Sequence, residues 1–228
     1  SGSIAQSNDI RGGEGIQKFT AYARKDAYVR ADWAPQAGQT LTAAYQWTKL
    51  HRVPRTDRLQ SGQDLKYDFE PQERQLASVA YETDTELRLF HNLRGVVSLH
   101  RQVEGRDMVS AKTPSLETFD EDRVNTWRIN GEAHSNFSEG HVLVSGVEFY
   151  RDNIRSKRSE VDHRTGGAAT RQPQYPDGSH YEQLGLYVQE DVTAGDFRFL
   201  AGMRYSRFAF TGLLNDKFGW IRHRSSDL

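Results

Sequence analysis

Long runs of period-two alternation constrain this chain more than any other feature of its sequence. In the stretch from His180 to Phe208, apolar residues such as Leu186 and Val188 take every second position, and amides and charges take most positions between. Because side chains on a strand point to alternate faces, the two halves predict strands with one apolar and one polar face. Residues 193–196 (TAGD) lie between them and predict a tight turn. This stretch therefore predicts a long β-hairpin.

Six earlier runs alternate in the same way and predict strands at about 19–34, 39–50, 67–83, 92–105, 122–136 and 141–155. Each exceeds the ordinary strand length of about 5–6 residues. The connections alternate between short (35–38, 84–91, 137–140, 193–196) and long (51–66, 106–120, 156–179). Outer-membrane barrels have such long strands, with short turns on the periplasmic side and long loops outside. The pattern predicts an all-β fold, an antiparallel up-and-down meander of about eight long strands that is part of a larger transmembrane β-barrel.

The alternation also predicts which residues share a face. One continuous convex surface is expected to carry Leu143, Val147, Phe149, Leu184, Leu186, Val188, Phe199, Ala201 and Met203. The concave side is expected to carry Glu132, Glu148, Gln189 and Arg204. A shift of one residue would invert a whole strand, so these two sets test the assignment.

Composition excludes several other classes of protein. Hydrophobic residues make up 36% of the chain and charged residues 27%, and no apolar run approaches the roughly 20 residues of a membrane helix. Net charge is −1, so no basic field points to a nucleic-acid partner. The chain has no cysteine, and its eight histidines show no zinc-protease spacing. Nucleophile-elbow, P-loop and dinucleotide motifs are absent from the sequence, so we expect no enzyme, catalytic residue, metal ligand or cofactor.

Several segments resemble the barrel strands of TonB-dependent outer-membrane receptors. They are residues 26–30 (DAYVR) with 33–35 (WAP), 45–46 (YQ) with 53–59 (VPRTDRL), 146–152 (GVEFYRD), and 186–191 (LYVQED) with 200–205 (LAGMRY). Their order and spacing, over most of residues 20–210, carry the resemblance. It implies a barrel of about 22 strands closed by an N-terminal plug. The plug, its coupling box and the C-terminal strand of such a barrel are not recognised in this sequence.

The resemblance implies a partial receptor and transporter in the outer membrane of a Gram-negative bacterium. Its implied partners are outer-membrane lipid, an extracellular ligand (an iron chelate such as an iron-siderophore, or haem) and the inner-membrane energy-coupling protein, reached through the missing plug. Two alternatives remain open. One is another outer-membrane barrel of porin or adhesin type, and the other is a soluble all-β ligand-binding domain.

The predicted organisation has three parts. Residues 1–18 are expected to form a polar loop, 19–210 the partial barrel, and 211–228 an extracellular loop leading to a missing strand. Both chain ends fall on the long-loop side, which predicts a mid-barrel segment whose first and eighth strands lack partners. Candidate ligand-binding residues in the long loops are His51, Arg55, Asp57, His163, Arg164 and Tyr175. His223 is a further loop histidine of the same kind.

Overall fold

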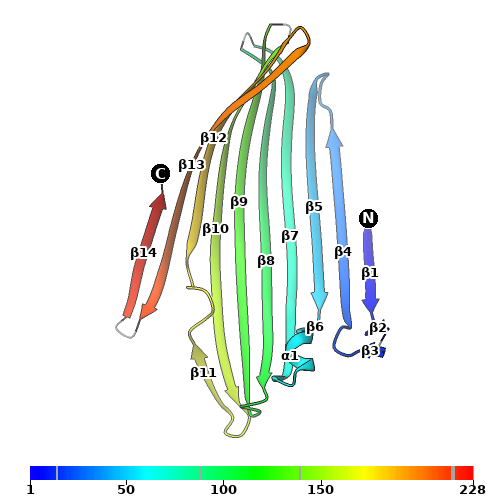
Figure 1. Cartoon of the computed structure of the whole chain (residues 1–228), viewed down its shortest axis with the longest axis vertical. Coiled ribbons are helices and arrows are strands. Elements are labelled where there is room, and N and C mark those ends of the chain that lie inside the picture. Colours follow the sequence, from blue (N-terminus) through cyan, green and yellow to red (C-terminus); the bar gives the residue numbers. More distant parts are fainter. Residues whose placement is uncertain (14, 88, 139, 217–218, 228) are drawn as a thin grey trace.

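The computed structural model describes residues 1–13, 15–87, 89–138, 140–216 and 219–227, and side chains are described up to residue 212 except residue 86. Strands make up 79% of the chain. Twelve strands form one antiparallel sheet in the order β1-β4-β5-β7-β8-β9-β10-β12-β13-β14, with β6 added to β7 and β11 to β10 (Figure 1). A separate two-stranded sheet joins β2 and β3. The predicted all-β meander of about eight long strands is confirmed.

The long strands are β4 (Tyr22–Trp33), β5 (Gln39–His51), β7 (Asp64–Leu87), β8 (Phe90–Ser110), β9 (Leu116–Ser138), β10 (His141–Asp162), β12 (His180–Ala194) and β13 (Phe197–Asp216). The shorter elements are β1 (Gly2–Ser7), β2 (Ile10–Gly12), β3 (Gly15–Gln17), β6 (Val53–Pro54), α1 (Thr56–Gln60), β11 (Gly167–Arg171) and β14 (Gly219–Asp227). No helix in the described ranges is both long and apolar enough to cross a membrane.

The strand register confirms the predicted division into two faces. Residues directly opposite each other in an antiparallel pair share a face, and Val147 is paired with Leu186 on one side and Gly131 on the other. Leu186 is in turn paired with Tyr205. All nine apolar residues named above fall on this apolar face, and Glu132, Glu148, Gln189 and Arg204 fall on the opposite, polar face.

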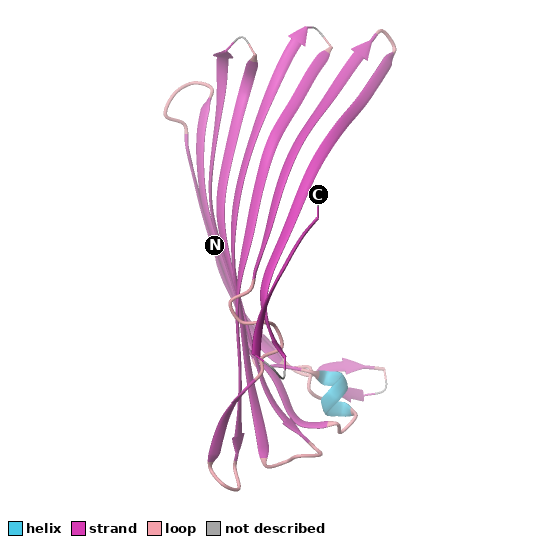
Figure 2. Ribbon diagram, turned by 90° about the vertical axis from the view of Figure 1, so that its left-hand side faces the viewer, coloured by secondary structure: helices cyan, strands magenta, loops and turns pink. Residues whose placement is uncertain are grey.

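The apolar face is open. The sheet is a single layer with no described element stacked on this face (Figure 2). Tyr67 and Val103 are the only buried apolar residues in the described part of the chain, whereas Met203 is 77% exposed and Val29 64%. A soluble sandwich would bury such a face against a second sheet. The apolar band is therefore a surface made to contact an apolar environment.

Aromatic side chains border this apolar band at both ends. Trp33, Tyr81 and Phe199 are exposed towards the short-turn end, and Tyr45 and Trp127 towards the long-loop end. Aromatic girdles of this kind are typical of membrane β-barrels, in which ring side chains lie at the two membrane–water interfaces.

The sequence prediction was wrong about both ends of the chain. Residues 1–18 are not simply a polar loop, because β1 pairs with β4 from Gly2↔Ala27 to Ser7↔Tyr22. Residues 211–228 are not a loop either, since β13 continues to Asp216 and pairs with β14. β1 and β14 are held by backbone hydrogen bonds to their neighbours, and neither has the apolar alternation by which a strand could be recognised from the sequence. Residues 217, 218 and 228 and the side chain of His223 lie outside what the structure describes.

The predicted first and eighth strands, β4 and β13, therefore both have outer neighbours, and the expectation that they lack partners was wrong. In the described part of the chain the sheet is open between β1 and β14. The predicted loops 51–66, 106–120 and 156–179 were also too long, because the strand segments at their ends lack the apolar alternation by which strands were recognised. β8 runs to Ser110, β9 begins at Leu116 and β10 runs to Asp162, and charged residues stand on both faces of these extensions.

A tyrosine covers a strand glycine on the polar face. Gly146 lies directly opposite Tyr187 on one side and Glu132 on the other. A Cβ on Gly146 would come within 2.3 Å of the Tyr187 ring, and the Tyr187 hydroxyl donates a 2.7 Å hydrogen bond to Glu132. The missing side chain of Gly146 is what lets the ring cross β10 to reach β9.

We predict that Gly146→Ala destabilises the sheet by about 1–2 kcal/mol, because the displaced ring loses a charge-assisted hydrogen bond. Tyr187→Phe should cost a similar amount, and the double variant should cost less than the sum of the two. Urea unfolding in lipid, followed by tryptophan fluorescence, measures all three. The control is Gly95→Ala, where an added Cβ meets nothing within 4 Å. Additive effects at the two sites would contradict this coupling.

A charged cluster ties β7, β8 and β9 together at the long-loop end, beyond the apolar band. Lys66 Nζ lies 2.8 Å from Glu117 Oε1 and also contacts Asp107. The Nε2 of His163 lies 2.7 Å from Glu117 Oε2. These contacts, the one with Lys66 foremost, lower the pKa of Glu117 from 4.5 to about 2. Burial raises the pKa of Asp107, so Glu117 is the carboxylate that holds its charge.

Because the folded-state pKa of Glu117 lies below its unfolded value, its contribution to stability is complete above about pH 4.5 and is lost as the pH falls towards about 2. We therefore predict that Glu117→Gln destabilises the protein at pH 7 and flattens the loss of stability between pH 5 and about 2. Urea midpoints measured across this range test the prediction. Glu82→Gln is the control, since its ion pair with Arg94 is 3.9 Å long and half exposed. An unchanged pH profile for Glu117→Gln would refute it.

Candidate ligand-binding surface

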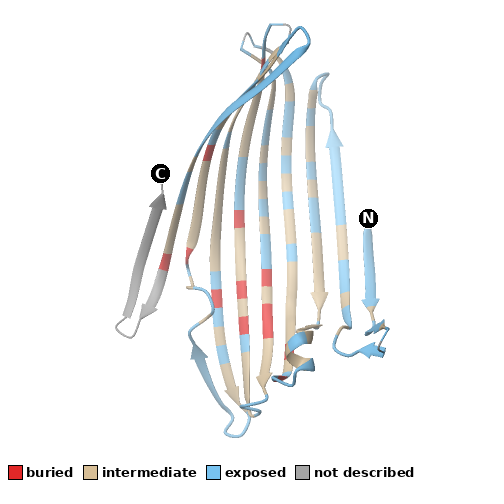
Figure 3. Ribbon diagram, viewed as in Figure 1, coloured by how far each residue is buried: buried red, intermediate tan, exposed pale blue. Residues whose placement is uncertain are grey.

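The polar face carries its densest side-chain network at the long-loop ends of β8, β9 and β10. Most of the buried residues in the described structure gather there, in the lower half of these strands (Figure 3). Arg106 from β8 is 9% exposed, and Asp120 and Asp122 from β9 are 4% and 8% exposed. Since these strands are antiparallel and in register, even-numbered residues of all three project to the same face.

Paired charges fill this network. Arg158 donates two hydrogen bonds to Asp120, at 2.6 and 2.7 Å. Arg106 donates to Asp122 at 2.5 Å and lies 3.6 Å from Asp120. Ser156 donates its hydroxyl hydrogen to the other oxygen of Asp122. Buried carboxylates are costly unless they are paired and hydrogen-bonded in this way, so the network forms a rigid floor.

The floor also holds the segment that follows β11. Arg106 donates a hydrogen bond to the side chain of Gln174, and the backbone N–H of Ser156 donates to Asp177 at 3.0 Å. Ile154 and Ser179 are joined through their backbones at 2.8 Å. These contacts hold residues 174–179 against β10, and they place the Tyr175 side chain over the polar face.

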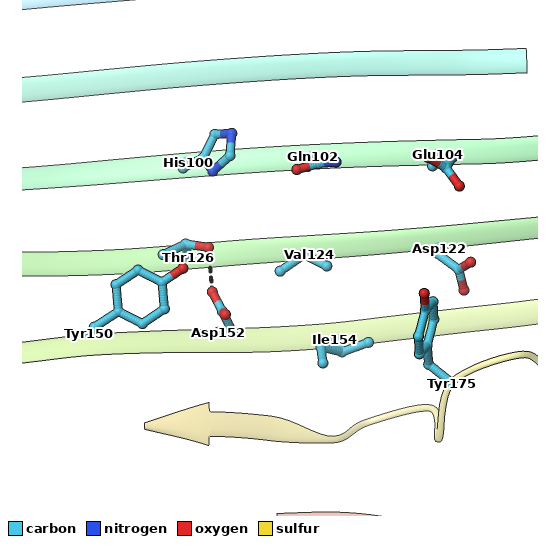
Figure 4. Close-up of a pocket in the computed structure, with 10 residues that line it drawn as sticks. All are labelled: His100, Gln102, Glu104, Asp122, Val124, Thr126, Tyr150, Asp152, Ile154 and Tyr175. Carbon is cyan, nitrogen blue, oxygen red and sulfur yellow. Dashed lines mark hydrogen bonds between the residues drawn. The ribbon is translucent and has the colours of Figure 1, made fainter. Parts of the chain in front are cut away.

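A cavity of roughly 340 Å³ lies beside the network. Its walls come from alternate residues of three strands and from one loop tyrosine (Figure 4): His100, Gln102, Glu104, Asp122, Val124, Thr126, Tyr150, Asp152, Ile154 and Tyr175. Figure 4 shows Tyr175 beside Asp122 and Ile154, with His100, Tyr150 and Asp152 towards the opposite end. Thr126 donates its hydroxyl hydrogen to Asp152. We call this site the polar-face cavity.

Hydrogen-bond acceptors and ring surfaces dominate the cavity. Arg74 Nε donates to His100 Nε2 at 2.9 Å, so this nitrogen is an acceptor and the imidazole is neutral. Glu104 and Asp152 add carboxylate oxygens, and Tyr150 and Tyr175 add rings. Within the described residues, no group of three or more histidines and carboxylates is arranged to hold a metal ion. The site is therefore suited to binding a ligand that donates hydrogen bonds or carries positive charge.

The six residues predicted as ligand contacts do not form one site. Tyr175 lines the cavity and is 47% exposed. Arg55 pairs with Asp57 at 3.2 Å beside α1 and lies 5.2 Å from the centre of the Tyr67 ring. The Nδ1 of His51 lies 3.1 Å from Glu70 at the end of β5.

The other two predicted contacts lie at the turn after β10. His163 approaches Glu117, as described above, and Arg164 lies 3.4 Å from Asp162. A role in ligand binding remains a prediction for all six residues. Arg106, Asp120 and Asp122 were not among them, because Arg106 and Asp120 were assigned to the loop 106–120 and Asp122 to the first position of the predicted strand 122–136. The two-residue spacing of Asp120 and Asp122 was the available signal that this segment is a strand.

Three solved structures share this fold. The chain is similar to the copper transporter OprC (TM-score 0.77, 16% identity), with 99% of this chain matching 37% of that one. It is similar to the ferric citrate transporter FecA in the unliganded form (TM-score 0.70, 15% identity, 92% of this chain and 32% of that one). It is also similar to a double mutant of the Serratia marcescens hemophore receptor HasR in complex with its hemophore HasA and heme (TM-score 0.68, 14% identity, 99% and 35%).

The chain thus spans about a third of the length of each of these structures. No curated protein matches its sequence. The model of one protein family, described as TonB dependent receptor-like, beta-barrel, matches residues 5–225. Together with the long meander, the two-faced strands and the aromatic girdles, this match shows that the chain belongs to the TonB-dependent receptor family and forms part of its β-barrel.

Proposed function

We propose that this chain is part of an outer-membrane receptor that takes up an extracellular ligand with energy supplied from the inner membrane. The single observation that carries the proposal is the cavity on the polar face at the long-loop end, built on a rigid charged floor. In a barrel whose apolar band faces lipid, the polar face lines the lumen. A ligand arriving from outside then meets this cavity before it enters the lumen.

The proposed ligand is a metal-bearing small molecule, an iron chelate or haem, with copper as a further candidate. The supporting observations are family membership and the names of the similar structures, which include copper, ferric citrate and heme systems. The ring surfaces and acceptors of the cavity suit a ligand with a flat or hydroxyl-bearing periphery. We propose transport and no enzymatic reaction, with lipid, the ligand and the energy-coupling protein as partners.

Uptake measurements test the class of function. The protein, expressed from its complete reading frame in a Gram-negative host lacking its own receptors, should accumulate one of three probes: ferric citrate, haem or copper(II). Accumulation should saturate and should stop when a protonophore collapses the inner-membrane potential. Uptake that is linear in probe concentration and insensitive to the protonophore would favour the porin alternative. Absence from the outer-membrane fraction would refute the proposal.

Two substitutions test the cavity. Tyr175→Ala and Asp152→Asn should each weaken binding of the transported probe about tenfold, because each removes a contact from the wall without touching the charged floor. Tyr28→Ala is the matched control: this tyrosine is 36% exposed on the polar face of β4, away from the cavity. Binding to purified protein and its amount in the membrane are both measured. Equal affinities for all variants would show that the ligand does not bind in the polar-face cavity. The other five predicted contacts would then be substituted in the same way.

A further inference from the structure

The apolar face carries nearly all its basic residues at one end. Between the short turns and the level of Trp127, Arg207 is the only Lys or Arg in a described outward position on β4–β13, and the register aligns it with Ile129 through Leu184 and Phe149. At or beyond that level, towards the long loops, eight outward positions are basic: Lys25, Lys49, Lys66, Arg101, Arg123, Arg151, Arg155 and Lys157. We call these eight residues the basic belt. Six acidic residues share this zone: Asp68, Glu73, Asp107, Glu117, Glu121 and Glu182.

Within the belt, three arginines converge on neighbouring strands. Arg123 of β9 lies directly opposite Arg155 of β10, and Arg101 of β8 is opposite Asn125, which is two residues from Arg123. Side chains directly opposite have Cβ atoms about 4.5–5.5 Å apart, and diagonal neighbours about 7–8 Å. We call Arg101, Arg123 and Arg155 the arginine triad.

Like charges in such positions destabilise a sheet unless something neutralises them. The acidic neighbours do so only in part. Arg123 Nη2 lies 3.2 Å from Glu121, and Arg155 Nη1 lies 3.9 Å from Asp177. The Arg155 side chain is 67% exposed and Arg101 is exposed as well. A second directly opposed basic pair, Lys25 and Lys49, repeats the arrangement on β4 and β5.

The position of the triad identifies the chemistry of its partner. Trp127 marks the border of the apolar band, and Arg151 lies directly opposite it. A basic group at this depth faces the headgroup layer, where its stem lies along apolar surface and its charge reaches outward. Guanidinium groups bind phosphate oxygens with paired hydrogen bonds. Basic residues next to a membrane are attracted to anionic lipids.

We propose that the arginine triad is a binding site for the phosphate-bearing headgroup of an anionic lipid, in the leaflet on the long-loop side. The inference rests on the proposed membrane location but not on the identity of the transported ligand. The bound phosphate would neutralise the opposed arginines and fix the depth of the barrel on that side. At the short-turn end, from the level of Trp33 outwards, the described outward positions include Glu190 and His141 but no Lys or Arg.

Lipid binding to the protein expressed from its complete reading frame provides the test. The protein is purified in maltoside detergent and titrated with phosphatidylglycerol or phosphatidylcholine, and bound lipids are counted by native mass spectrometry. Phosphatidylglycerol should bind at least tenfold more tightly, and the preference should weaken as salt is added. The triple variant Arg101→Gln, Arg123→Gln, Arg155→Gln should lose about tenfold or more of the affinity for phosphatidylglycerol and little of that for phosphatidylcholine.

The matched control removes three arginines from the polar face, Arg94→Gln, Arg128→Gln and Arg198→Gln, and should keep the preference. A heat-shifted band on a gel verifies that each variant is folded. If the triple variant does not fold, Arg155→Gln alone is used. The ion pair of Arg155 with Asp177, at 3.9 Å, is longer than that of Arg123 with Glu121, at 3.2 Å, so its loss should cost less stability. Equal affinity for the two lipids, or a preference that survives loss of the triad, overturns the proposal. Displacement of the lipid by millimolar inorganic phosphate would also overturn it, in favour of a small-anion site.

Membrane fractionation separates this proposal from the previous one. A protein absent from the outer membrane refutes the proposed function. A protein present there, with uptake intact and no preference for phosphatidylglycerol, refutes the lipid site alone.

Discussion

The whole structure depends on backbone hydrogen bonding between neighbouring strands. An apolar surrounding offers no water to a peptide group, so every N–H and C=O at that depth needs a partner within the protein. The continuous registers from β4 to β13 meet this requirement strand by strand. Because the ladder satisfies the backbone, the side chains are free to differ completely between the two faces.

That freedom is used three times along the same strands. On the polar face, residues such as Asp120 and Arg158 build a hydrogen-bonded floor beside the cavity. On the lipid side, the same strands present an exposed apolar band with aromatic borders. On the same side, beyond the apolar band towards the long loops, Arg123 and Arg155 oppose each other. The proposed ligand site and the proposed membrane-facing surfaces thus use alternate positions of the same strands, and neither face has to compromise for the other.

Sequence reasoning succeeded where one face of a strand is apolar and failed where neither is. The sides of Val147, Leu186 and Glu148 followed from alternation alone, because the band imposes a strict period of two. Beyond the band charged residues stand on both faces and the strict alternation ends, so the strand segments around Arg106 and Asp120 looked like loops although the ladder continues through them.

Two further features depend on contacts that a single sequence does not display. β1 is held through its backbone, and its polar residues carry no pattern that marks a strand. The place of Tyr175 over the polar face depends on the contacts of Gln174 and Asp177 with distant strands. The alternation thus predicted the fold class and the two faces, while the cavity required the tertiary arrangement.

The extension of β9 from Trp127 to Leu116, past the apolar band, also limits how such receptors can diversify. Insertion of one residue between Asp122 and Thr126 would turn Asp122, Asp120 and everything beyond them towards the lipid side. Insertion of two would keep them on the lumen side and only lengthen the wall. Residues 111–115, which connect β8 to β9, carry no such restriction. Without a bulge of the kind found between Phe69 and Gln72 of β7, the strands beyond the apolar band can therefore change length during evolution only in steps of two residues. The connection 111–115 can change by any number.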